Sequence, residues 1–401
     1  MPIADRSLAL VVWGLGVSQI VGFGTLYYAF GILAPDMARD FGWTIEWIYA
    51  ALSAALLAGS FAAPVSGRRF DRHGAAAVMS VGSMASALAL AVTAASPSPA
   101  LFLLGLIAIQ AASCLVQYNA AFAVLVQVAP RRAGRTITLL TLIAGFASTL
   151  FWPLTVWLHE IYDWRTVYFA YAALNLVICL PIHLALTRLA RRVSLPASTG
   201  AAAEHLPGSI DPAQRRLALI LLTAAFSLMG FVFSALLIHM VPMLMSLGLG
   251  AMAVAVGAAF GPSQFAARLI NMVFGARLKP AILAVIAAAA LPASLVVLLA
   301  ASPWPPGAFV FALLLGIGSG LNSIVQGTLP LWMFGDANYG ALLGRITAAR
   351  LVVSSMAPFV FSWLDVTFGV ATALSLTAFL GAAAVLAFAA IARLRNTAAA
   401  A

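Results

Sequence analysis

The chain of 401 residues is 64% hydrophobic and only 8% charged, with a mean hydropathy of +1.06. Soluble domains carry about 25% charged residues, so this composition excludes a water-soluble enzyme, and the high hydrophobicity excludes a disordered chain. The net charge of +10 does not indicate a nucleic-acid partner, because such a partner needs a solvated basic face that so few polar residues cannot build.

Twelve apolar segments follow one another along the chain, separated by charged residues, prolines and glycines. Each is about as long as the roughly 20 residues that span a bilayer. We predict helices rather than strands, because isolated strands cannot satisfy their backbone in lipid and because the hydrophobicity is continuous rather than alternating. The expected fold is an all-α polytopic membrane protein with helices over residues 8–34, 46–66, 75–96, 100–128, 134–158, 165–187, 217–246, 250–274, 281–301, 307–334, 341–364 and 369–392.

Basic residues gather in alternate connections between these helices. With both termini in the cytoplasm, the cytoplasmic segments hold 17 of the 21 Lys and Arg residues, and the opposite side holds only Arg39 and Arg165. Because cytoplasmic loops carry an excess of Lys and Arg, we predict a multi-pass protein of the cell (inner) membrane with both termini in the cytoplasm. The 17 residues are Arg6, Arg68, Arg69, Arg72, Arg131, Arg132, Arg135, Arg188, Arg191, Arg192, Arg215, Arg216, Arg277, Lys279, Arg345, Arg393 and Arg395.

The longest polar stretch, residues 188–216, contains Pro, Gly, Ser and charged residues and is typical of a flexible cytoplasmic linker. It divides the chain into two predicted six-helix bundles, residues 1–187 and 217–401. The halves also repeat each other at offsets of 208 to 210 residues, which supports a duplication. Met37, Gly42, Gly67, Arg69, Gly134 and Arg135 correspond to Met245, Gly250, Gly275, Arg277, Gly344 and Arg345.

A motif follows the second predicted helix: Gly67-Arg68-Arg69-Phe70-Asp71-Arg72-His73-Gly74. It resembles the loop 2–3 signature of the major facilitator superfamily, G-x-x-x-D-R-x-G, although Ala75 and Ala76 stand where basic residues are usual. The twelve helices and their six-plus-six division also resemble this family. The resemblance implies two pseudo-symmetric bundles around a central cavity and alternating access by rocking of the halves. It also implies that Gly67, Asp71, Arg72 and Gly74 help to hold one conformation closed. The alternative is a solvated turn. Asp71 can pair with Arg72 or face a helix N-terminus.

Few ionisable residues lie deep within the predicted helices, and three of them are singled out here: His239 in the seventh, Arg268 in the eighth and Arg350 in the eleventh. Such residues are functional candidates. No Asp or Glu lies well inside any predicted helix, so two buried guanidinium groups favour an anionic occupant, and their geometry suits carboxylates. The alternative is that both arginines extend to the cytoplasmic boundary or bind backbone carbonyls. His239 is either a proton-coupling group or a structural histidine.

The positions of the two arginines resemble those of basic residues in two branches of the family. The oxalate–formate antiporter branch places one in helix 8 and another in helix 11, and the monocarboxylate porter branch shares the first. Gln264 lies one turn before Arg268, where proton-coupled monocarboxylate porters typically carry an aspartate. The resemblance therefore puts proton coupling by that route in doubt.

Further substrate-binding candidates lie in helices 1, 4 and 10, because the first and fourth helices of each half commonly line the cavity in this family. The set is Tyr28, Gln117, Tyr118, Asn322 and Gln326, together with Gln264 in helix 8.

We predict a secondary active transporter of a small organic anion, a mono- or dicarboxylate, working by exchange or proton symport. The alternative is an exporter of a neutral drug, a metabolite or an arsenical-type oxyanion. The sequence holds no convergent set of catalytic groups, no cofactor motif and no metal-ligand spacing. The expected partners are the substrate and the lipid bilayer, without nucleic acid, and we expect a monomer.

Overall fold

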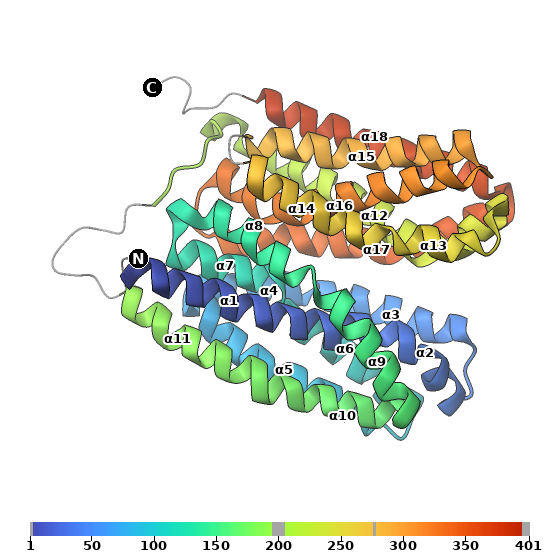
Figure 1. The fold of residues 1–401 in the computed structure, drawn as a ribbon. Coiled ribbons are helices and arrows are strands. Elements are labelled where there is room, and N and C mark those ends of the chain that lie inside the picture. Colours follow the sequence, from blue (N-terminus) through green and yellow to red (C-terminus); the bar gives the residue numbers. More distant parts are fainter. Residues whose placement is uncertain (1–2, 195–204, 276–277, 395–401) are drawn as a thin grey trace. The chain divides into compact units, whose positions relative to one another are not determined.

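A computed structural model describes residues 3–194, 205–275 and 278–394 (Figure 1). Part of the predicted linker, residues 195–204, lies outside the described residues. Of the basic residues assigned to the cytoplasm, Arg277 and Arg395 lie outside them too, as do the side chains of Arg6, Arg191 and Arg192.

The described part of the chain is helical almost throughout, and an isolated bridge between Pro207 and Gly335 is its only extended pairing. The helices of the first half are α1 (Ile3–Phe23), η1 (Gly24–Tyr28), α2 (Ala29–Asp40), α3 (Ile45–Ser60), α4 (Ala62–His73), α5 (Ala75–Ala94), α6 (Pro99–Val116), α7 (Tyr118–Val128), η2 (Pro130–Arg132), α8 (Ala133–Ala144), α9 (Ala147–Ile161), α10 (Trp164–Leu174), η3 (Asn175–Cys179) and α11 (Leu180–Ser194). Those of the second half are η4 (Pro212–Gln214), α12 (Arg215–Leu244), η5 (Met245–Leu249), α13 (Met252–Ala258), α14 (Phe260–Phe274), α15 (Pro280–Ala301), α16 (Pro305–Phe334), α17 (Tyr339–Phe368) and α18 (Val370–Arg393).

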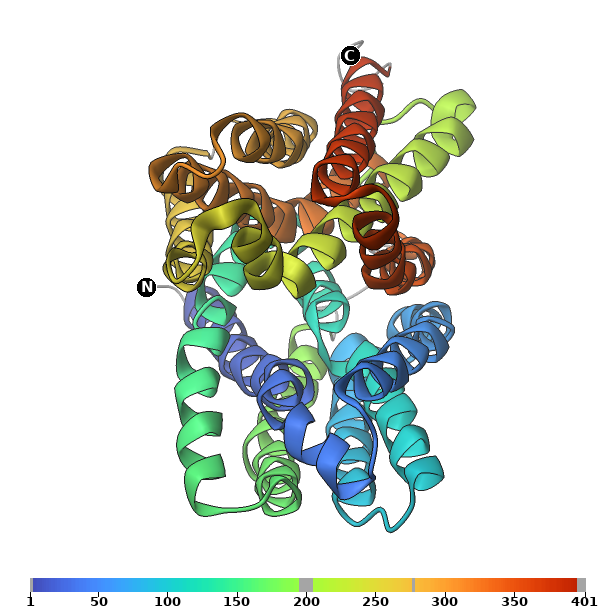
Figure 2. The same cartoon turned by 90° about the vertical axis from the view of Figure 1, so that its right-hand side faces the viewer.

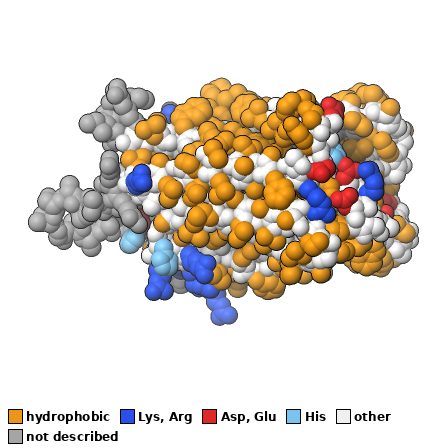
Figure 3. Space-filling model, turned by 90° about the horizontal axis from the view of Figure 1, so that it is seen from below, with side chains coloured by type: hydrophobic (Ala, Val, Ile, Leu, Met, Phe, Trp, Pro, Cys, Tyr) orange, Lys and Arg blue, Asp and Glu red, His pale blue; other side chains and the backbone are white. Residues whose placement is uncertain are grey.

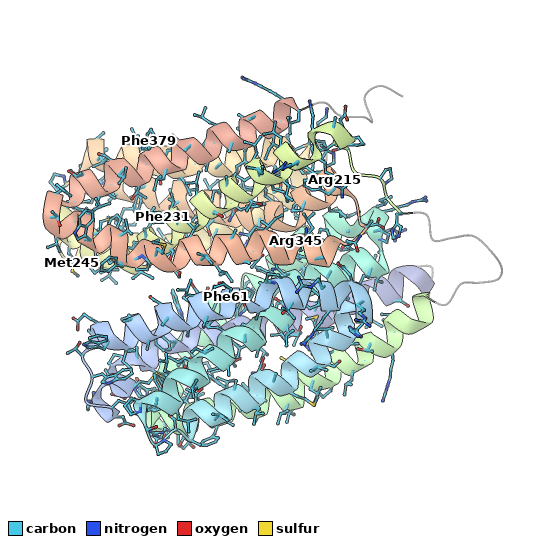
Figure 4. The ribbon with its side chains drawn as sticks, turned by 180° about the vertical axis from the view of Figure 1, so that it is seen from behind. Phe61, Arg215, Phe231, Met245, Arg345 and Phe379 are labelled. Carbon is cyan, nitrogen blue, oxygen red and sulfur yellow. The ribbon has the colours of Figure 1, made fainter. Side chains whose placement is uncertain are left out.

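These helices confirm the predicted polytopic fold. Among the described residues, 11 helical segments are long and apolar enough to cross a membrane, and α3 with α4, bent by 40°, makes a twelfth. Phe61 lies at this bend (Figure 4). The predicted sixth helix was too short, since α11 continues from the predicted end at residue 187 to Ser194. Helical hydrogen bonding does not require apolar side chains, so the helix extends past the point where the hydrophobicity falls.

Two compact units make up the chain: residues 1–206 with 336–348, here the N-terminal unit, and residues 207–335 with 349–401, here the C-terminal unit. In the N-terminal unit, α5 packs against α6, α10 and α11, and α1 against α8 and α11 (Figure 1). In the C-terminal unit, α15 packs against both α16 and α18, α14 packs against α16, and α12 against α18 (Figure 2). The first turns of α17 thus belong with the N-terminal unit. The predicted division at 188–216 placed all residues after 216 in the second bundle.

Large apolar side chains are exposed along the helices, as Leu10 on α1 (67%), Leu386 on α18 (71%) and Val366 on α17 (85%) illustrate. The space-filling view shows apolar side chains between an end where Lys, Arg and His gather and an end where acidic and basic side chains mix (Figure 3). A surface of this kind suits lipid between two aqueous faces. The protein is a multi-pass membrane protein.

Candidate functional site

The motif found in the sequence is mostly helical rather than a loop, because Gly67 to His73 form the last two turns of α4. Gly74 ends the helix with φ of +83°, a conformation that favours glycine. Arg72 is exposed in the last turn, where a cation is favourable beside the negative end of the helix dipole. The expectation of a solvated turn therefore holds only for Gly74.

Asp71 binds the start of another helix within the N-terminal unit. Its Oδ1 accepts a hydrogen bond from the backbone N–H of Gly340 at 2.9 Å, and its Oδ2 accepts one from Ala341 at 2.7 Å. These N–H groups are the second and third of α17, which have no acceptor within their own helix. The carboxylate therefore satisfies two donors and faces the positive end of the helix dipole, the second of the two arrangements expected for Asp71.

Gly67 permits this contact by its lack of a side chain. A Cβ at Gly67 would lie 2.2 Å from the carbonyl oxygen of Gly340, and a Cβ at Gly344 would lie 2.5 Å from that of Ala63. Gln127 at the end of α7 connects the end of α4 to the start of α5. Its Nε2 donates to Phe70 O and its Oε1 accepts from Ala75 N, both at 2.9 Å. Sequence reasoning missed Gln127, because a side chain that bridges two distant backbone groups leaves no local pattern.

Arg268 is buried between α14 and α16 of the C-terminal unit, with 4% of its surface exposed. Its Nε donates to Ser323 Oγ at 3.0 Å and lies 3.4 Å from Gly320 O. One turn before it, Gln264 donates to Ser319 Oγ at 2.7 Å. The two helices come this close because Gly320 has no side chain: a Cβ there would lie 2.4 Å from Gln264 O. The guanidinium is thus held from its Nε side by neutral oxygens.

The other residues predicted on α16 lie near these contacts in the sequence. Asn322 precedes the Ser323 that binds Arg268, is buried, and has an Oδ1 that no hydrogen bond satisfies. Gln326 follows one turn later and is half-buried. Ser319, Ser323 and Gln326, at spacings of four and three, lie on one face of the helix. The predicted residues Arg268, Gln264 and Asn322 are therefore close together on facing helices.

Arg350 lies half-buried on α17, in the part that belongs to the C-terminal unit. Its aliphatic stem packs against α12 at Gly230, where a Cβ would lie 2.8 Å from Arg350 Cγ and 2.4 Å from Ser354 Oγ. Figure 4 shows α12 extending from Arg215 past Phe231, with Met245 at the start of η5 directly after it.

The C-terminal unit has few acidic residues to accompany its arginines. It contains only Asp211 and Asp365, and no Glu. Asp211 caps the turn before α12, and Asp365 lies 15 residues, or about 22 Å, along α17 from Arg350. The acidic residues therefore lie near helix ends, whereas Arg268 and Arg350 lie within helices.

The predicted residues of the N-terminal unit belong to a row of aromatic rings. Tyr28 packs edge-on against Trp152 with ring centroids 5.8 Å apart, and Phe23 lies 6.5 Å from Tyr28 and 4.7 Å from Tyr118. Tyr118 stacks on Phe122 at 5.2 Å. Gln117 is half-buried beside this row, in the break between α6 and α7. The structure thus brings Tyr28, Tyr118 and Gln117 into one region.

His239 has surroundings typical of a structural histidine. Its Nε2 lies 3.0 Å from the carbonyl oxygen of Pro358, and its ring stacks on Phe361 with centroids 5.1 Å apart. Both contacts hold α12 against α17 within the C-terminal unit. They favour the structural alternative over proton coupling.

The apolar helical spans of the described residues define a polytopic membrane protein. The chain belongs to the Major Facilitator Superfamily, because the profile of that family matches residues 15–358. The protein is accordingly a transporter that binds small-molecule substrates within the membrane, and it is not an enzyme.

Solved structures with this fold cover nearly the whole chain. The human organic anion transporter MFSD10 (TETRAN) has a TM-score of 0.70 and 16% identity, with 97% of this chain and 100% of that chain covered. The proton:xylose symporter XylE has a TM-score of 0.72 and 12% sequence identity, and the match covers 95% of both chains. The transporter FucP in the outward conformation has a TM-score of 0.66 and 16% sequence identity. The match covers 96% of this chain and 98% of that chain. A search among curated proteins gave no significant match.

Proposed function

We propose that the protein is a secondary active transporter that works by alternating access and moves a small organic anion, a mono- or dicarboxylate, by exchange or proton symport. The burial of Arg268 supports this most directly. Its guanidinium lies between two helices of a unit whose acidic residues lie near helix ends. A cation held in low dielectric attracts an anionic ligand strongly, and guanidinium recognises carboxylates in a bidentate way.

The fold itself admits other substrates. One structure with this fold is an organic anion transporter, and another is a proton:xylose symporter. An exporter of a neutral drug, a metabolite or an arsenical-type oxyanion is therefore the second candidate. It differs from the first in the role of the arginines, because a neutral substrate makes no use of their charge.

We also propose the cellular setting and the gate. The protein lies in the inner membrane as a monomer, with both termini in the cytoplasm. Gly67, Asp71, Arg72 and Gly74 form the gate, in which Asp71 holds the start of α17 through two hydrogen bonds. Because bonds to a charged group stabilise the conformation that contains them, though less for an exposed carboxylate such as Asp71, breaking and remaking them shifts the balance between conformations.

Uptake of radiolabelled carboxylates into proteoliposomes tests the anion site. Arg268→Gln and Arg350→Gln should each lower uptake by about 30-fold or more, because losing one partner of a buried charge pair costs about 2–5 kcal/mol. Arg216→Gln, a change at an exposed arginine at the start of α12, is the matched control and should leave uptake intact. Thermal unfolding in detergent establishes that each variant is folded. Undiminished uptake by both folded variants would exclude the anion site and favour the neutral substrate.

A further inference from the structure

The last part of the predicted linker is built onto the C-terminal unit. The sequence predicts a flexible linker over residues 188–216, but Ser209 and Ile210 are buried, with 8% and 7% of their surfaces exposed. Directly after them, Asp211 caps the short helix η4, because its Oδ1 accepts a backbone hydrogen bond at 2.9 Å. Residues 207–210, here called the strap, therefore form packed structure before α12 begins.

The strap lies along the end of α16. Ser209 N donates to Trp332 O at 3.0 Å. Ile210 N donates to Met333 O at 3.3 Å. Both carbonyl groups belong to the last turn of α16, where they have no donor within their own helix. The strap thus caps the C-terminus of α16 with two backbone hydrogen bonds.

Gly208 lets the strap come this close. A Cβ at Gly208 would lie 2.7 Å from the carbonyl carbon of Phe334 and even closer to Met333 O, so alanine there would force the two backbones apart. Arg215, the first residue of α12, lies over the ring of Phe334 with its Cζ 5.4 Å from the centroid. The strap and Arg215 together bind the start of α12 to the end of α16.

A short connection leads from the strap to the start of α17. Pro207 and Gly335 form an antiparallel bridge, and α17 begins at Tyr339, four positions after Gly335. Gly335 turns the chain with φ of +78°, which favours glycine. Asp336 O accepts from Tyr339 N at 3.3 Å, and Asp336 Oδ1 lies 3.1 Å from the Nδ1 of His205, just before the strap. The connection between α16 and α17 is thus held on both sides of Gly335.

We propose that the strap positions the start of α17 for Asp71, so that the central linker acts on the gate. The inference rests on the gate proposed above and not on the chemistry of the substrate. The N–H groups that Asp71 binds are those of Gly340 and Ala341, which follow Gly335 by five and six positions. The strap fixes the end of α16, and the short connection passes this constraint to the start of α17. A displaced strap leaves that start free to move away from Asp71.

Hydrogen exchange measured by mass spectrometry tests the strap without any substrate. In Gly208→Ala the added Cβ displaces the strap, so the amides of residues 209–210 should exchange faster than in the wild type. The peptide with Gly340 and Ala341 should then exchange about fivefold faster or more, because the net contribution of about one hydrogen bond changes an opening equilibrium by such a factor. Ile210→Ala, which removes the buried side chain of the strap, should give the same result.

Gly134→Ala is the matched control. It is the same change at a glycine where a Cβ would meet no neighbouring segment within 4 Å, so exchange at the start of α17 should stay within about twofold of the wild type. The peptide around Thr166, at the start of α10, is the internal reference and should exchange alike in all these proteins. If Gly208→Ala fails to fold, Ile210→Ala carries the test.

Asp71→Ala separates the strap from the gate. It should raise exchange at Gly340 and Ala341, because it removes the acceptor of both N–H groups. If it does so while Gly208→Ala and Ile210→Ala accelerate only residues 209–210, the strap does not act on the gate and the proposal is overturned, although the gate stands. Equal acceleration around Thr166 would also overturn it, because the strap variants would then loosen the protein generally. Unchanged exchange in Asp71→Ala would refute the gate and the role of the strap together.

Discussion

The hydrogen bonds of Asp71 make it the residue on which the proposed gate depends. Asp71→Ala removes both bonds to the start of α17 and leaves its N–H groups without the carboxylate. Because Asp71 is exposed, water replaces some of the loss, and we expect a destabilisation of about 1–3 kcal/mol. The midpoint temperature of thermal unfolding in detergent and the rate of uptake should both fall. Asp71→Asn, which keeps one acceptor but no charge, should lie between the alanine variant and the wild type.

Arg69→Gln is the control for this change, because it alters an exposed charge two residues away on the same helix. Its stability should stay within about 0.5 kcal/mol of the wild type. An Asp71→Ala protein as stable and active as Arg69→Gln would show that the contact with α17 does not contribute to the gate.

Single residues were predictable where their chemistry is unusual for their surroundings. Arg268, Arg350 and Asp71 stand out in a chain with 8% charge, and the sequence indicated a helix N-terminus as one partner for Asp71. Which helix it binds depends on packing between segments some 270 positions apart. Gln127 was not predicted as a site residue, because its role consists of bonds to backbone groups far away in the sequence.

The helices themselves followed from hydrophobicity, which each segment carries locally. The predicted segment 100–128 nevertheless concealed the break at Gln117, since no Pro or Gly lies there to indicate one. At the break, Val116 O accepts a hydrogen bond from Gln19 on a different helix, a contact that the segment itself does not contain. The opposite error occurred in the motif, which the family resemblance placed in a loop after residue 66, whereas α4 continues to His73. Of the two glycines in the motif, Gly74 has a positive φ that favours glycine, and Gly67 does not.

The start of α10 gives a pH-dependent prediction at the level of one helix. Asp163 is its N-cap, and its carboxylate accepts from the backbone N–H of Thr166 at 2.7 Å. This bond holds the pKa of Asp163 below its ordinary value of 3.8. A carboxyl group with a lowered pKa stabilises the folded state above its unfolded pKa and loses that contribution as the pH falls through the folded one.

Asp163→Ala should therefore destabilise the protein by about 1 kcal/mol at pH 6, and the difference should shrink as the pH drops below about 3.8. Asp163→Asn is the matched control, because Asn caps helices about as well as Asp but does not titrate. Thermal unfolding across pH 3 to 7 measures both. A constant gap between the alanine variant and the wild type at all pH values would contradict this assignment.

At the scale of the whole molecule, the number of spans depends on the hydrophobicity of each segment, so it was the easiest feature to predict. The twelve spans are consistent with the structure and the family. The division into units was harder, because the chain leaves the C-terminal unit at Gly335 and returns to it at Ala349. This excursion reflects the contact of α17 with α4, which the linear pattern of apolar segments does not contain.

The predicted orientation in the membrane depends on basic residues from the whole length of the chain. Basic residues gather at one end of the face seen in Figure 3, where acidic residues are absent, and 17 of the 21 Lys and Arg residues fall on the predicted cytoplasmic side. A green fluorescent protein fused after Ala401 should therefore fluoresce, and alkaline phosphatase fused at the same point should be inactive. Phosphatase inserted at Gly42, in the short connection between α2 and α3, should be active, because that connection is predicted to face outward. Active phosphatase at Ala401 with an inactive insertion at Gly42 would reverse the orientation and place the Asp71 contact on the outer side of the membrane.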